Sequence, residues 1–454
     1  MNKDILIAVI GNTDPIRGQY DGPLLHIVRW YRPEKVFMIL TEEIARTELE
    51  YHQNEEAIHM LDQSCEVELI NTGVCDAHSF DDFSLSFLSF CSRIKEEHPE
   101  NRILLNISSG TPQMQTALCM IALSDPARYC PVQVSTPEHS ANRAQVFNPR
   151  MDLIEEWFEN DMDNLEETPS RCMTPKLLNF RRTIIQMQII SLIENYDYSG
   201  ACQIYETEKE SFSDAAGILL KHAKKRVNLE NKEAEALALK LGLKSELYPF
   251  GRTGGMGKLI DFFNSMKIKQ FRGELNDFSM RLEIMAEYLG IYVLENVMKV
   301  RLSDITTESK VKGSKIIRTN REKCTNKISG IEKYLNEQFA DRGGYEWGKP
   351  LNALTIIHLI TYLSKTERFK KYSEPVSEMM KWVELSSAVR NPAAHTIVSI
   401  TDDMIRESYG KDSAGLCRSM QRVLIQIFGT EVKKEAFDIY DTINDRIKIE
   451  MENS

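Results

Sequence analysis

The sequence lacks the features of a membrane-anchored or secreted protein. No apolar run reaches the roughly 18 residues that a membrane-spanning helix needs. The first four residues lead directly into a strand-like run, so we expect no signal peptide. The nine cysteines are scattered without a CxxC pair, which favours reduced thiols over a disulfide framework or a zinc site. We therefore expect a cytoplasmic protein with no membrane partner.

Motifs for metals and cofactors are also missing. No HExxH motif or other pairing stands out among the nine histidines, so we expect no metal and no cofactor. No GxGxxG follows the first strand-like run and no P-loop follows any such run, which disfavours an ordinary dinucleotide fold. The formal net charge of −11 argues against the coating of duplex nucleic acid through bulk charge. One segment, 299–327, is locally basic and fits a solvated surface or an RNA-facing patch equally well.

The composition is that of a soluble globular protein. The chain has 454 residues, of which 42% are hydrophobic and 27% charged, and this length predicts two or three domains. In the first part of the chain, apolar runs typical of buried strands alternate with helical patterns. We expect strands at 4–10, 35–40, 67–71, 102–107, 132–135 and 144–147, and helices at 24–30, 41–61, 81–97 and 113–123. This alternation predicts a Rossmann-like α/β domain with a parallel sheet and right-handed crossovers.

Two loops of this sheet are candidate ligand sites, because ligands of such sheets bind beyond the carboxyl ends of the strands. Loop 1 is Gly11-Asn12-Thr13-Asp14, after the first strand. Loop 2 is Ser108-Ser109-Gly110-Thr111, after the fourth strand and at the start of a helix. Loop 2 offers backbone N–H groups, a helix dipole and hydroxyl donors, all suited to phosphate or ribose. Taken alone, however, this loop is explained more simply by helix capping through Ser109 or Thr111.

The rest of the chain is dominated by helical periodicity. A short acidic stretch ending near residue 170 predicts a domain linker at about 160–175, and no later run shows strand alternation. We expect helices at 177–195, 198–209, 213–226, 232–241, 258–266, 277–302, 316–339, 353–364, 376–389, 413–428 and 431–449. The C-terminal part is therefore expected to be all-α, with Trp347, His358 and Trp382 as packing residues.

The segment from Arg390 to His395 carries the chemistry of this helical part. Pro392 is expected to break or kink the helix before it, which would put an arginine and a histidine at a helix end. Histidine can move a proton near neutral pH, and arginine can brace the oxygens of a phosphorane-like transition state. The pair therefore suits metal-free cleavage of RNA through its own 2′-hydroxyl. The spacing alone is a weak signal, because an Arg-x4-His match often arises by chance.

Taken together, the two loops and the Arg-x4-His segment resemble the CRISPR-associated accessory ribonucleases of type III Csm systems, which join a CARF domain to a HEPN domain. The resemblance covers essentially the whole chain. It implies a CARF domain at 1–160, a helical connecting region at 175–270 and a HEPN domain at 271–454. It also implies a homodimer whose paired CARF domains bind a cyclic oligoadenylate as allosteric activator, with hexa-adenylate favoured over tetra-adenylate. The implied ligand-binding residues are Gly11, Asn12, Thr13, Asp14, Ser108, Ser109, Gly110, Thr111 and Gln113.

The resemblance further implies an endoribonuclease of antiviral defence that cuts single-stranded RNA without metal and leaves a 2′,3′-cyclic phosphate. Two copies of Arg390 and His395 would form one composite site, in which His395 transfers protons, Arg390 stabilises charge and Asn391 orients the site. Some relatives also slowly cleave the activator in the CARF domain, and Thr111 is the residue we suspect for that here. No stable association with the interference complex is expected.

Two other classes of function stay open. The first is a non-catalytic, ligand-responsive regulator with a CARF-like sensor domain, although no winged-helix or helix-turn-helix pattern supports it. The second is a small-molecule enzyme on the α/β domain. It would need a nucleophile or an acid–base pair in the strand-end loops, where Asp14 is the only obvious ionised group.

Overall fold

The computed structural model describes residues 4–137, 159, 161–165, 168–249, 255–311, 314–395 and 399–453. The chain divides into two compact units, Met1–Thr183 and Ile184–Ser454. The division falls within helix α7 (Leu178–Glu194), after the linker expected at about 160–175. Within the described ranges, every helix is too short or too polar to span a bilayer.

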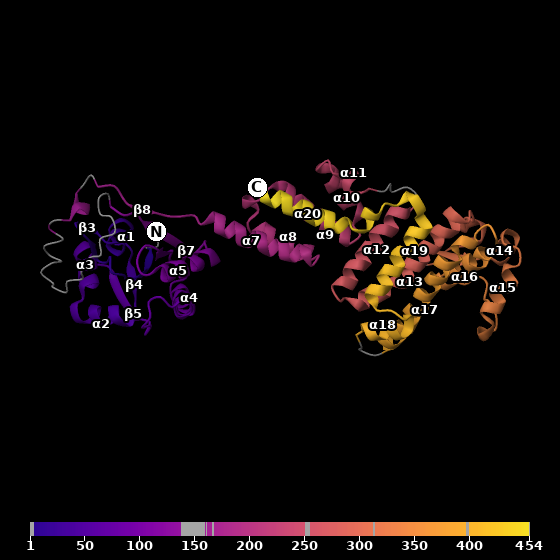
Figure 1. Ribbon diagram of the computed structural model, residues 1–454, viewed down its shortest axis with the longest axis horizontal. Helices are drawn as coiled ribbons and strands as arrows, with labels where there is room; N and C mark the ends of the chain where they lie inside the picture. The colour runs from indigo at the N-terminus through magenta and orange to yellow at the C-terminus, as the bar shows by residue number, and fades with distance from the viewer. Residues whose placement is uncertain are drawn as a thin grey trace. The chain divides into compact units, whose positions relative to one another are not determined.

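The first unit is built on a sheet of six strands in the order β5-β4-β1-β6-β7-β8 (Figure 1). The strands are β1 (Ile5–Val9), β4 (Lys35–Leu40), β5 (Glu66–Asn71), β6 (Ile103–Asn106), β7 (Tyr129–Val134) and β8 (Cys172–Met173). All neighbours pair in parallel except β8, which is antiparallel to β7. The predicted parallel sheet is therefore confirmed. The short β8 was not predicted, and the strand expected at 144–147 lies outside the described residues.

Helices cover both faces of this sheet. The even-numbered residues of β1 pack against α1 (Pro23–Tyr31), α2 (Glu42–Tyr51) and α3 (Gln53–Leu61) on one face. The odd-numbered residues of β1 pack against α4 (Phe80–Glu97) and α5 (Pro112–Ser124) on the other face. Successive side chains of a strand point to opposite faces, and every residue of β1 is buried. This two-sided burial explains why the first strand is apolar throughout.

The single helix expected at 41–61 is in fact two helices. His52 has a left-handed φ of 49° and separates α2 from α3. The buried carboxylate of Glu48 favours this break, because it accepts the N–H groups of Asn54 (2.9 Å) and Glu55 (3.0 Å) in the first turn of α3. At the other end, Thr41 is the N-cap of α2, as predicted, and accepts from the N–H of Ile44.

The second unit has two hydrophobic cores. The first core joins α7, α8 (Tyr198–Thr207), α9 (Asp214–Val227), α10 (Asn231–Lys240), α11 (Lys244–Leu247) and the C-terminal α20 (Ile439–Glu452). The second core is built from α12 (Met256–Phe271), α13 (Leu275–Tyr292), α14 (Arg321–Lys327), α15 (Ile331–Gln338), α16 (Ala353–Ser364), α17 (Ser373–His395), α18 (Asp402–Tyr409) and α19 (Ser413–Phe428). Asn444 anchors α20, since it accepts from the hydroxyl of Tyr198 (2.9 Å) and donates to the carbonyl of Ile193 (2.8 Å). The last helix thus returns to the first helices of the unit, across the boundary that we placed at 270–271.

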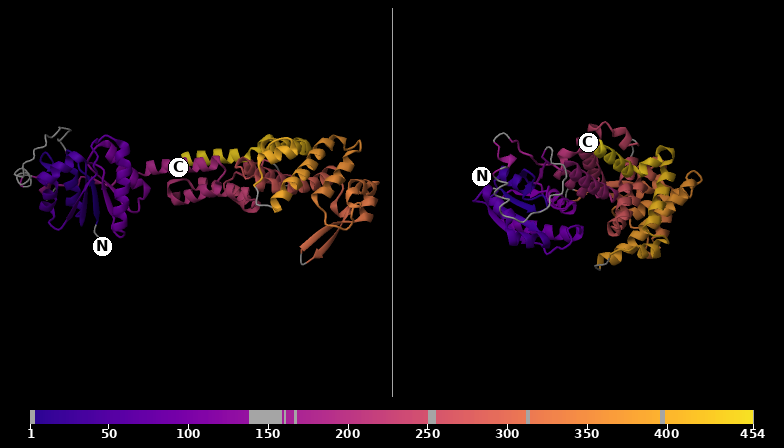
Figure 2. Two further views of the ribbon diagram at one scale, coloured as in Figure 1. Left: turned by 90° about the horizontal axis from the view of Figure 1, so that it is seen from below. Right: turned by 60° about the vertical axis from the view of Figure 1, so that its left-hand side comes forward.

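The prediction of an all-α C-terminal part is wrong at one place. Strands β9 (Thr306–Val311) and β10 (Ser314–Thr319) form an antiparallel hairpin, visible as paired arrows in the left view of Figure 2. The hairpin is followed by α14 and α15, where we expected one helix at 316–339. The sequence does contain a hairpin signal here: two runs rich in threonine and isoleucine, separated by two residues of which the second is glycine. We missed it because helical periodicity dominates this part of the chain.

The basic segment 299–327 includes this hairpin. Lys327 pairs with Asp304 at 3.0 Å, and Arg321 pairs with Glu332 at 2.5 Å. These two cations have acidic partners within the unit, which favours the interpretation of a solvated surface for them.

A buried ion pair joins the two cores of the helical unit. Arg226 on α9 is fully buried and donates to the Asp261 carboxylate on α12 through Nη2 (2.7 Å) and Nε (3.0 Å). Its third nitrogen donates to the carbonyl of Leu247 (2.6 Å), and its guanidinium lies 4.3 Å from the ring centre of Tyr248. Every donor nitrogen of Arg226 thus has a partner, as a buried cation requires.

We predict that Asp261→Ala lowers the free energy of unfolding by about 3–5 kcal/mol, because it leaves the Arg226 cation buried without its counter-charge. The apolar double variant Arg226→Met/Asp261→Leu should recover most of this loss, since the intact pair also carries a desolvation cost. Urea unfolding of both variants measures the two effects. Lys225→Ala, which removes a half-exposed pair with Glu230 near the end of α9, is the control and should cost less than about 1 kcal/mol. A loss for Asp261→Ala as small as that of the control would contradict the prediction.

Candidate functional site

Loops 1 and 2 lie side by side at the switch point of the sheet. Loop 1 follows β1 and loop 2 follows β6, and these two strands are parallel neighbours in the middle of the sheet. From β1 the chain proceeds to β4 and β5 on one side, and β6 and β7 then extend the sheet on the other side. Ligands of doubly wound sheets bind at such a reversal of strand order. The fold therefore brings together the two loops that the sequence singled out.

The two loops touch through their backbones. A Cβ atom on Gly11 would lie 2.6 Å from the nitrogen and 3.1 Å from the Cα of Gly110, so a side chain would force the loops apart. Gly110 itself has a left-handed φ of 80°, which disfavours other residues. Glycine is thus required at both points of contact.

Asp14 holds loop 1 together from inside. Its carboxylate accepts the N–H of Leu24 (2.9 Å) at the start of α1 and the N–H of Gly11 (3.2 Å) within the loop. Burial raises the pKa of Asp14 to about 6, although hydrogen bonds from Leu24, Ser109 and Gly11 act in the opposite direction. The carboxylate is 5% exposed and engaged by backbone donors. This arrangement leaves it poorly placed as the acid or base of a small-molecule enzyme.

Loop 2 is held in a similar way. Asn106, at the end of β6, donates to the hydroxyl of Ser109 (2.9 Å) and accepts from the N–H of Ser108 (3.0 Å). The Ser108 hydroxyl accepts from the N–H of Val134 (2.7 Å) on β7. Thr111 caps α5 and donates its hydroxyl to the carbonyl of Ala77 (2.8 Å). The hydroxyls of loop 2 are therefore engaged within the protein, and the capping that we expected from Thr111 is confirmed.

The groups that face outward in the two loops are fewer than the nine predicted. Asn12 is exposed, and Gly11, Thr13, Ser108, Gly110, Thr111 and Gln113 are partly exposed, whereas Asp14 and Ser109 are buried. The side-chain oxygen of Gln113 is buried and has no hydrogen-bond donor among the described residues. Asn106 was not among the predicted residues; its only signal in the sequence is a polar residue at the end of an apolar strand.

The Arg390-x4-His395 segment lies at the C-terminal end of α17. Of the break or kink predicted at Pro392, the break is wrong, because α17 continues to His395; the segment nevertheless ends the helix, as expected. Proline removes one hydrogen bond from a helix, and the burial of Trp382, Leu385 and Val389 on the same helix offsets that loss. On a regular helix, positions five apart are separated by about 7.5 Å along the axis and by about 140° around it. Positions 390 and 395 therefore do not share a face of α17, and the side chains of 390–395 lie outside the described residues.

The surroundings of α17 fix its position. The Glu378 carboxylate accepts from Tyr409 (2.7 Å) on α18 and from Ser419 (3.1 Å) on α19. Burial alone would raise the pKa of Glu378. These two hydrogen bonds, together with the hydrogen bond from Lys381, bring that pKa below its ordinary value. Beyond the segment, the N–H of Ile400 donates to the side chain of Asn276 (2.7 Å) on α13.

The ring of His358 packs among aromatic side chains of the second core. Its ring packs against Phe339 (5.2 Å) and Tyr334 (6.2 Å), and burial lowers the pKa of His358. This agrees with the packing role that we expected.

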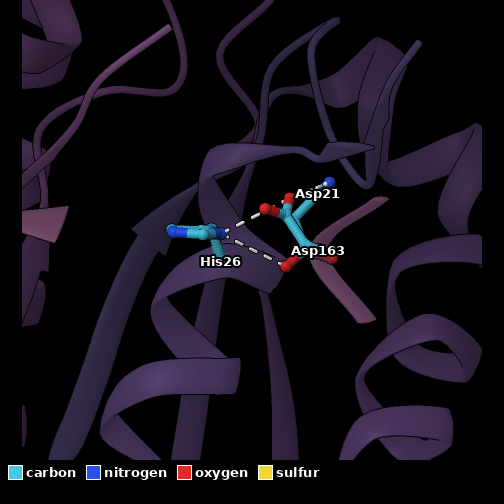
Figure 3. A group of neighbouring side chains, drawn as sticks. All are labelled: Asp21, His26 and Asp163. Carbon is cyan, nitrogen blue, oxygen red and sulfur yellow. Dashed lines mark hydrogen bonds and ion pairs between the residues drawn. The ribbon is translucent and has the colours of Figure 1, made fainter. Parts of the chain in front are cut away.

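A second cluster of titratable side chains lies behind loop 1. Asp21, His26 and Asp163 meet closely enough to resemble a metal site (Figure 3). Two guanidinium groups neutralise it, since Arg29 contacts Asp21 at 2.6 Å and Arg171 contacts Asp163 at 2.7 Å. Burial alone would raise the pKa of Asp163, but hydrogen bonds from His26 and Arg171 lower it to about 2.

His26 has no lone pair to offer a cation. Its Nε2 accepts the backbone N–H of Arg171 at 2.9 Å, so the ring proton is on Nδ1, which faces Asp21 and Asp163. The cluster is therefore a buried ionic network and not a vacant metal site. Asp163 is 142 positions from Asp21 in the sequence, which is too far for a pattern to reveal that they meet.

Three family models match the chain in succession. They are the Cas_Csm6 CARF domain at residues 66–172, the CRISPR-associated protein Csm6 6H domain at 175–227, and the Cas_Csm6 HEPN domain at 253–448. The first match includes loop 2, and the third includes the Arg390–His395 segment.

Curated relatives match over almost the full length. A CRISPR system endoribonuclease Csm6 from Enterococcus italicus is 27% identical, with 98% of this chain and 99% of the relative covered. One of the same name from Mycobacterium tuberculosis is 28% identical, with 98% and 97% covered. The solved structure of Enterococcus italicus Csm6 bound to cyclic hexa-2′-fluoro-hexa-dAMP has the same fold, with a TM-score of 0.69, 24% identity, and 99% and 100% of the two chains covered.

We predict that Gly11→Ala destabilises the first unit by about 1–3 kcal/mol, because the added methyl group would overlap the backbone of Gly110. Thermal unfolding followed by circular dichroism measures this. Asn12→Ala, at the exposed neighbouring position, is the control and should melt like the parent. Equal melting of both variants and the parent would mean that the loops do not touch as described.

The raised pKa of Asp14 predicts a pH dependence of stability. Between about pH 4 and pH 6 the folded protein keeps a proton on Asp14 that the unfolded chain has released. The free energy of unfolding of the parent, relative to Asp14→Asn, should therefore fall as the pH rises through this range, by up to roughly 3 kcal/mol, and then stay level. Urea unfolding of both proteins at several pH values measures this. A difference that stays constant from pH 4 to pH 7 would contradict it.

Proposed function

Because the chain belongs to the type III CRISPR-associated accessory ribonucleases with CARF and HEPN domains, we propose that it is a homodimeric endoribonuclease which cyclic oligoadenylate switches on. The observation that carries the proposal is the order of the matches: a ligand-binding sheet first, and a helical domain with Arg390 and His395 last. The substrate is single-stranded RNA.

The reaction we propose is an internal transesterification. His395 takes the proton from the RNA 2′-hydroxyl, whose oxygen then bonds to the adjacent phosphorus. The bond from phosphorus to the 5′-oxygen breaks, and that oxygen takes up the proton that His395 holds, giving a 2′,3′-cyclic phosphate and a 5′-hydroxyl. Arg390 stabilises the charge on the phosphorane oxygens, and Asn391 orients the site. No step calls for a metal ion.

The activator would bind at the edge formed by loops 1 and 2. Loop 2 opens an α5 helix of 13 residues, whose N-terminal dipole favours a phosphate. Gln113, on the first turn of that helix, has a buried oxygen that a ligand donor such as an adenine amino group could satisfy. We retain the preference for the hexa-adenylate ring. The six-nucleotide analogue bound to the Enterococcus italicus protein makes that ring size the first probe.

The homodimer is supported by an unpartnered face of α13. One face of this helix is buried in the second core, but Met280, Ile284 and Tyr288 on another face are 53%, 44% and 61% exposed. Ile284 and Tyr288, with Phe262 and Tyr292, help to line an open cavity of about 700 Å³. Because α13 packs against α17, a second copy seated on this face would be separated by one helix from the helix that carries Arg390 and His395. The wide separation of positions 390 and 395 around α17 also favours a site completed by two copies.

The first test is cleavage of a labelled single-stranded RNA in EDTA, without activator and with cyclic tetra- or hexa-adenylate. The parent should cut only with one ring, and His395→Ala and Arg390→Ala should lose at least about a hundredfold in rate. Both variants should keep ring binding and dimerisation. Binding of a ring without cleavage by the parent would favour the non-catalytic regulator, and a need for metal would overturn the mechanism.

The second test addresses the dimer. Ile284→Glu should weaken dimerisation at least about tenfold and reduce cleavage in parallel, because it puts a charge into an apolar interface. Light scattering after size exclusion measures the dimer. The matched control is Ile449→Glu on α20, an isoleucine with the same 44% exposure that does not line the cavity. Equal dimerisation of the two variants would place the interface elsewhere.

A further inference from the structure

The ionic network behind loop 1 ties that loop to the segment through which the chain leaves the sheet. We define the network as the buried or mostly buried side chains of Asp21, His26, Arg29, Asp161, Asp163 and Arg171, three of which are shown in Figure 3. The first three follow loop 1, and the other three precede α7. No other covalent route leads from the sheet to the helical unit.

On the side of loop 1, the connection is short and stiff. The hairpin of β2 (Ile16–Arg17) and β3 (Tyr20–Asp21) directly follows the loop. A Cβ on Gly22 would lie 2.3 Å from the carbonyl oxygen of Thr13, so the loop and the end of β3 are in direct contact. Asp14 adds its bond to Leu24 at the start of α1. A displacement of loop 1 therefore displaces Asp21 and the start of α1 as well.

Arg171 lies at the other end of this connection and is hydrogen-bonded to its residues. Its Nη2 donates to the carbonyl of Asp21 (3.1 Å) and to the Asp163 carboxylate (2.7 Å), which also accepts the N–H of Asp21 (2.8 Å). Its backbone N–H donates to His26 at 2.9 Å. Three of these hydrogen bonds thus fix residues 163 and 171 to the corner between β3 and α1, and the fourth joins the two residues to each other.

Arg171 is also connected to loop 2. Its Nη1 donates to the carbonyl of Ser135 (3.0 Å), and its own carbonyl accepts the N–H of Ser135 (2.9 Å). The preceding residue, Val134, donates its N–H to the hydroxyl of Ser108 in loop 2 (2.7 Å). The connections of both loops therefore converge on Arg171, seven positions before α7 begins at Leu178.

We propose that Arg171 and Asp163 are positioning residues that couple occupancy of the two loops to the helical unit, so that the ring activates RNA cleavage through them. The inference rests on the proposed function, because it names the route by which that function is regulated. Neither residue is among those expected to touch the ring or the RNA. The network contributes by holding residues 161–165 and 168–173 in one place relative to the loops.

The test compares Arg171→Gln and Arg171→Lys with the parent in the full-length protein. Both variants should bind cyclic hexa-adenylate within about threefold of the parent by calorimetry, yet lose at least about tenfold in the ratio of RNA cleavage with and without saturating ring. Lysine keeps the charge beside Asp163 but cannot donate at once to Ser135, Asp21 and Asp163. It should therefore fold as well as the parent and still be uncoupled.

The matched control is Arg102→Gln. Arg102 makes a two-bond pair with Asp4 (2.6 and 3.0 Å) at the amino ends of the same strands β1 and β6, away from both loops. It should be activated like the parent. The double variant Asp163→Asn/Arg171→Gln should lose no more of the activation ratio than either single variant. The reason is that both substitutions break the same connection.

The outcomes separate the two proposals. Normal activation of a folded Arg171→Lys protein, or a loss of ring affinity that accounts for the lost activation, would overturn the coupling role while leaving the ribonuclease intact. If the parent itself binds no ring and cleaves no RNA with either ring, the proposed function fails and the coupling fails with it.

Discussion

The candidate ligand site depends on the contact between the backbones of Gly11 and Gly110. Parallel pairing of β1 and β6 brings their carboxyl ends together, and the missing side chains let the two loops approach to a distance at which a Cβ atom would overlap. Asp14 and Asn106 then hold the loops from the inside with buried hydrogen bonds. The residues of the two loops that are exposed or partly exposed carry no ionised side chain, which suits a polyanionic ring better than it suits acid–base catalysis.

In the helical unit, the constraint is continuity of α17. The helix carries Arg390, Asn391 and His395 on one uninterrupted backbone, and Glu378 bonds it to α18 and α19. Residues held in a helix have less local backbone freedom with which to switch than residues of a loop. Under the proposed function, control of such a site acts by moving whole helices against each other or by bringing two copies together, and the exposed face of α13 is the surface that we propose for the second copy.

The sequence predicted what local patterns determine. Two-sided burial makes β1, β4 and β6 apolar throughout, so their positions and the parallel sheet could be predicted, and with them the edge where loops 1 and 2 meet. The predictions were wrong where contacts between residues distant in the sequence determine the local structure. The break at His52 depends on the buried carboxylate of Glu48, and the continuation of α17 through Pro392 depends on burial against the second core. The network of Asp21 with Asp163 joins residues 142 positions apart, which no spacing rule can detect.

Stability alone does not account for the network around Arg171. Buried ion pairs give little net stabilisation compared with apolar residues of similar volume, because both charges lose their hydration. What such a network supplies is a unique geometry. The guanidinium of Arg171 meets Asp21, Asp163 and Ser135 together only when the corner between β3 and α1 and the edge between β7 and β8 are in register. A shift of either loop would break these bonds as a set, so the segment leading to α7 would have two distinct positions instead of a continuous range. Two such states with different affinity for the ring are what coupling between a binding site and a distant active site requires.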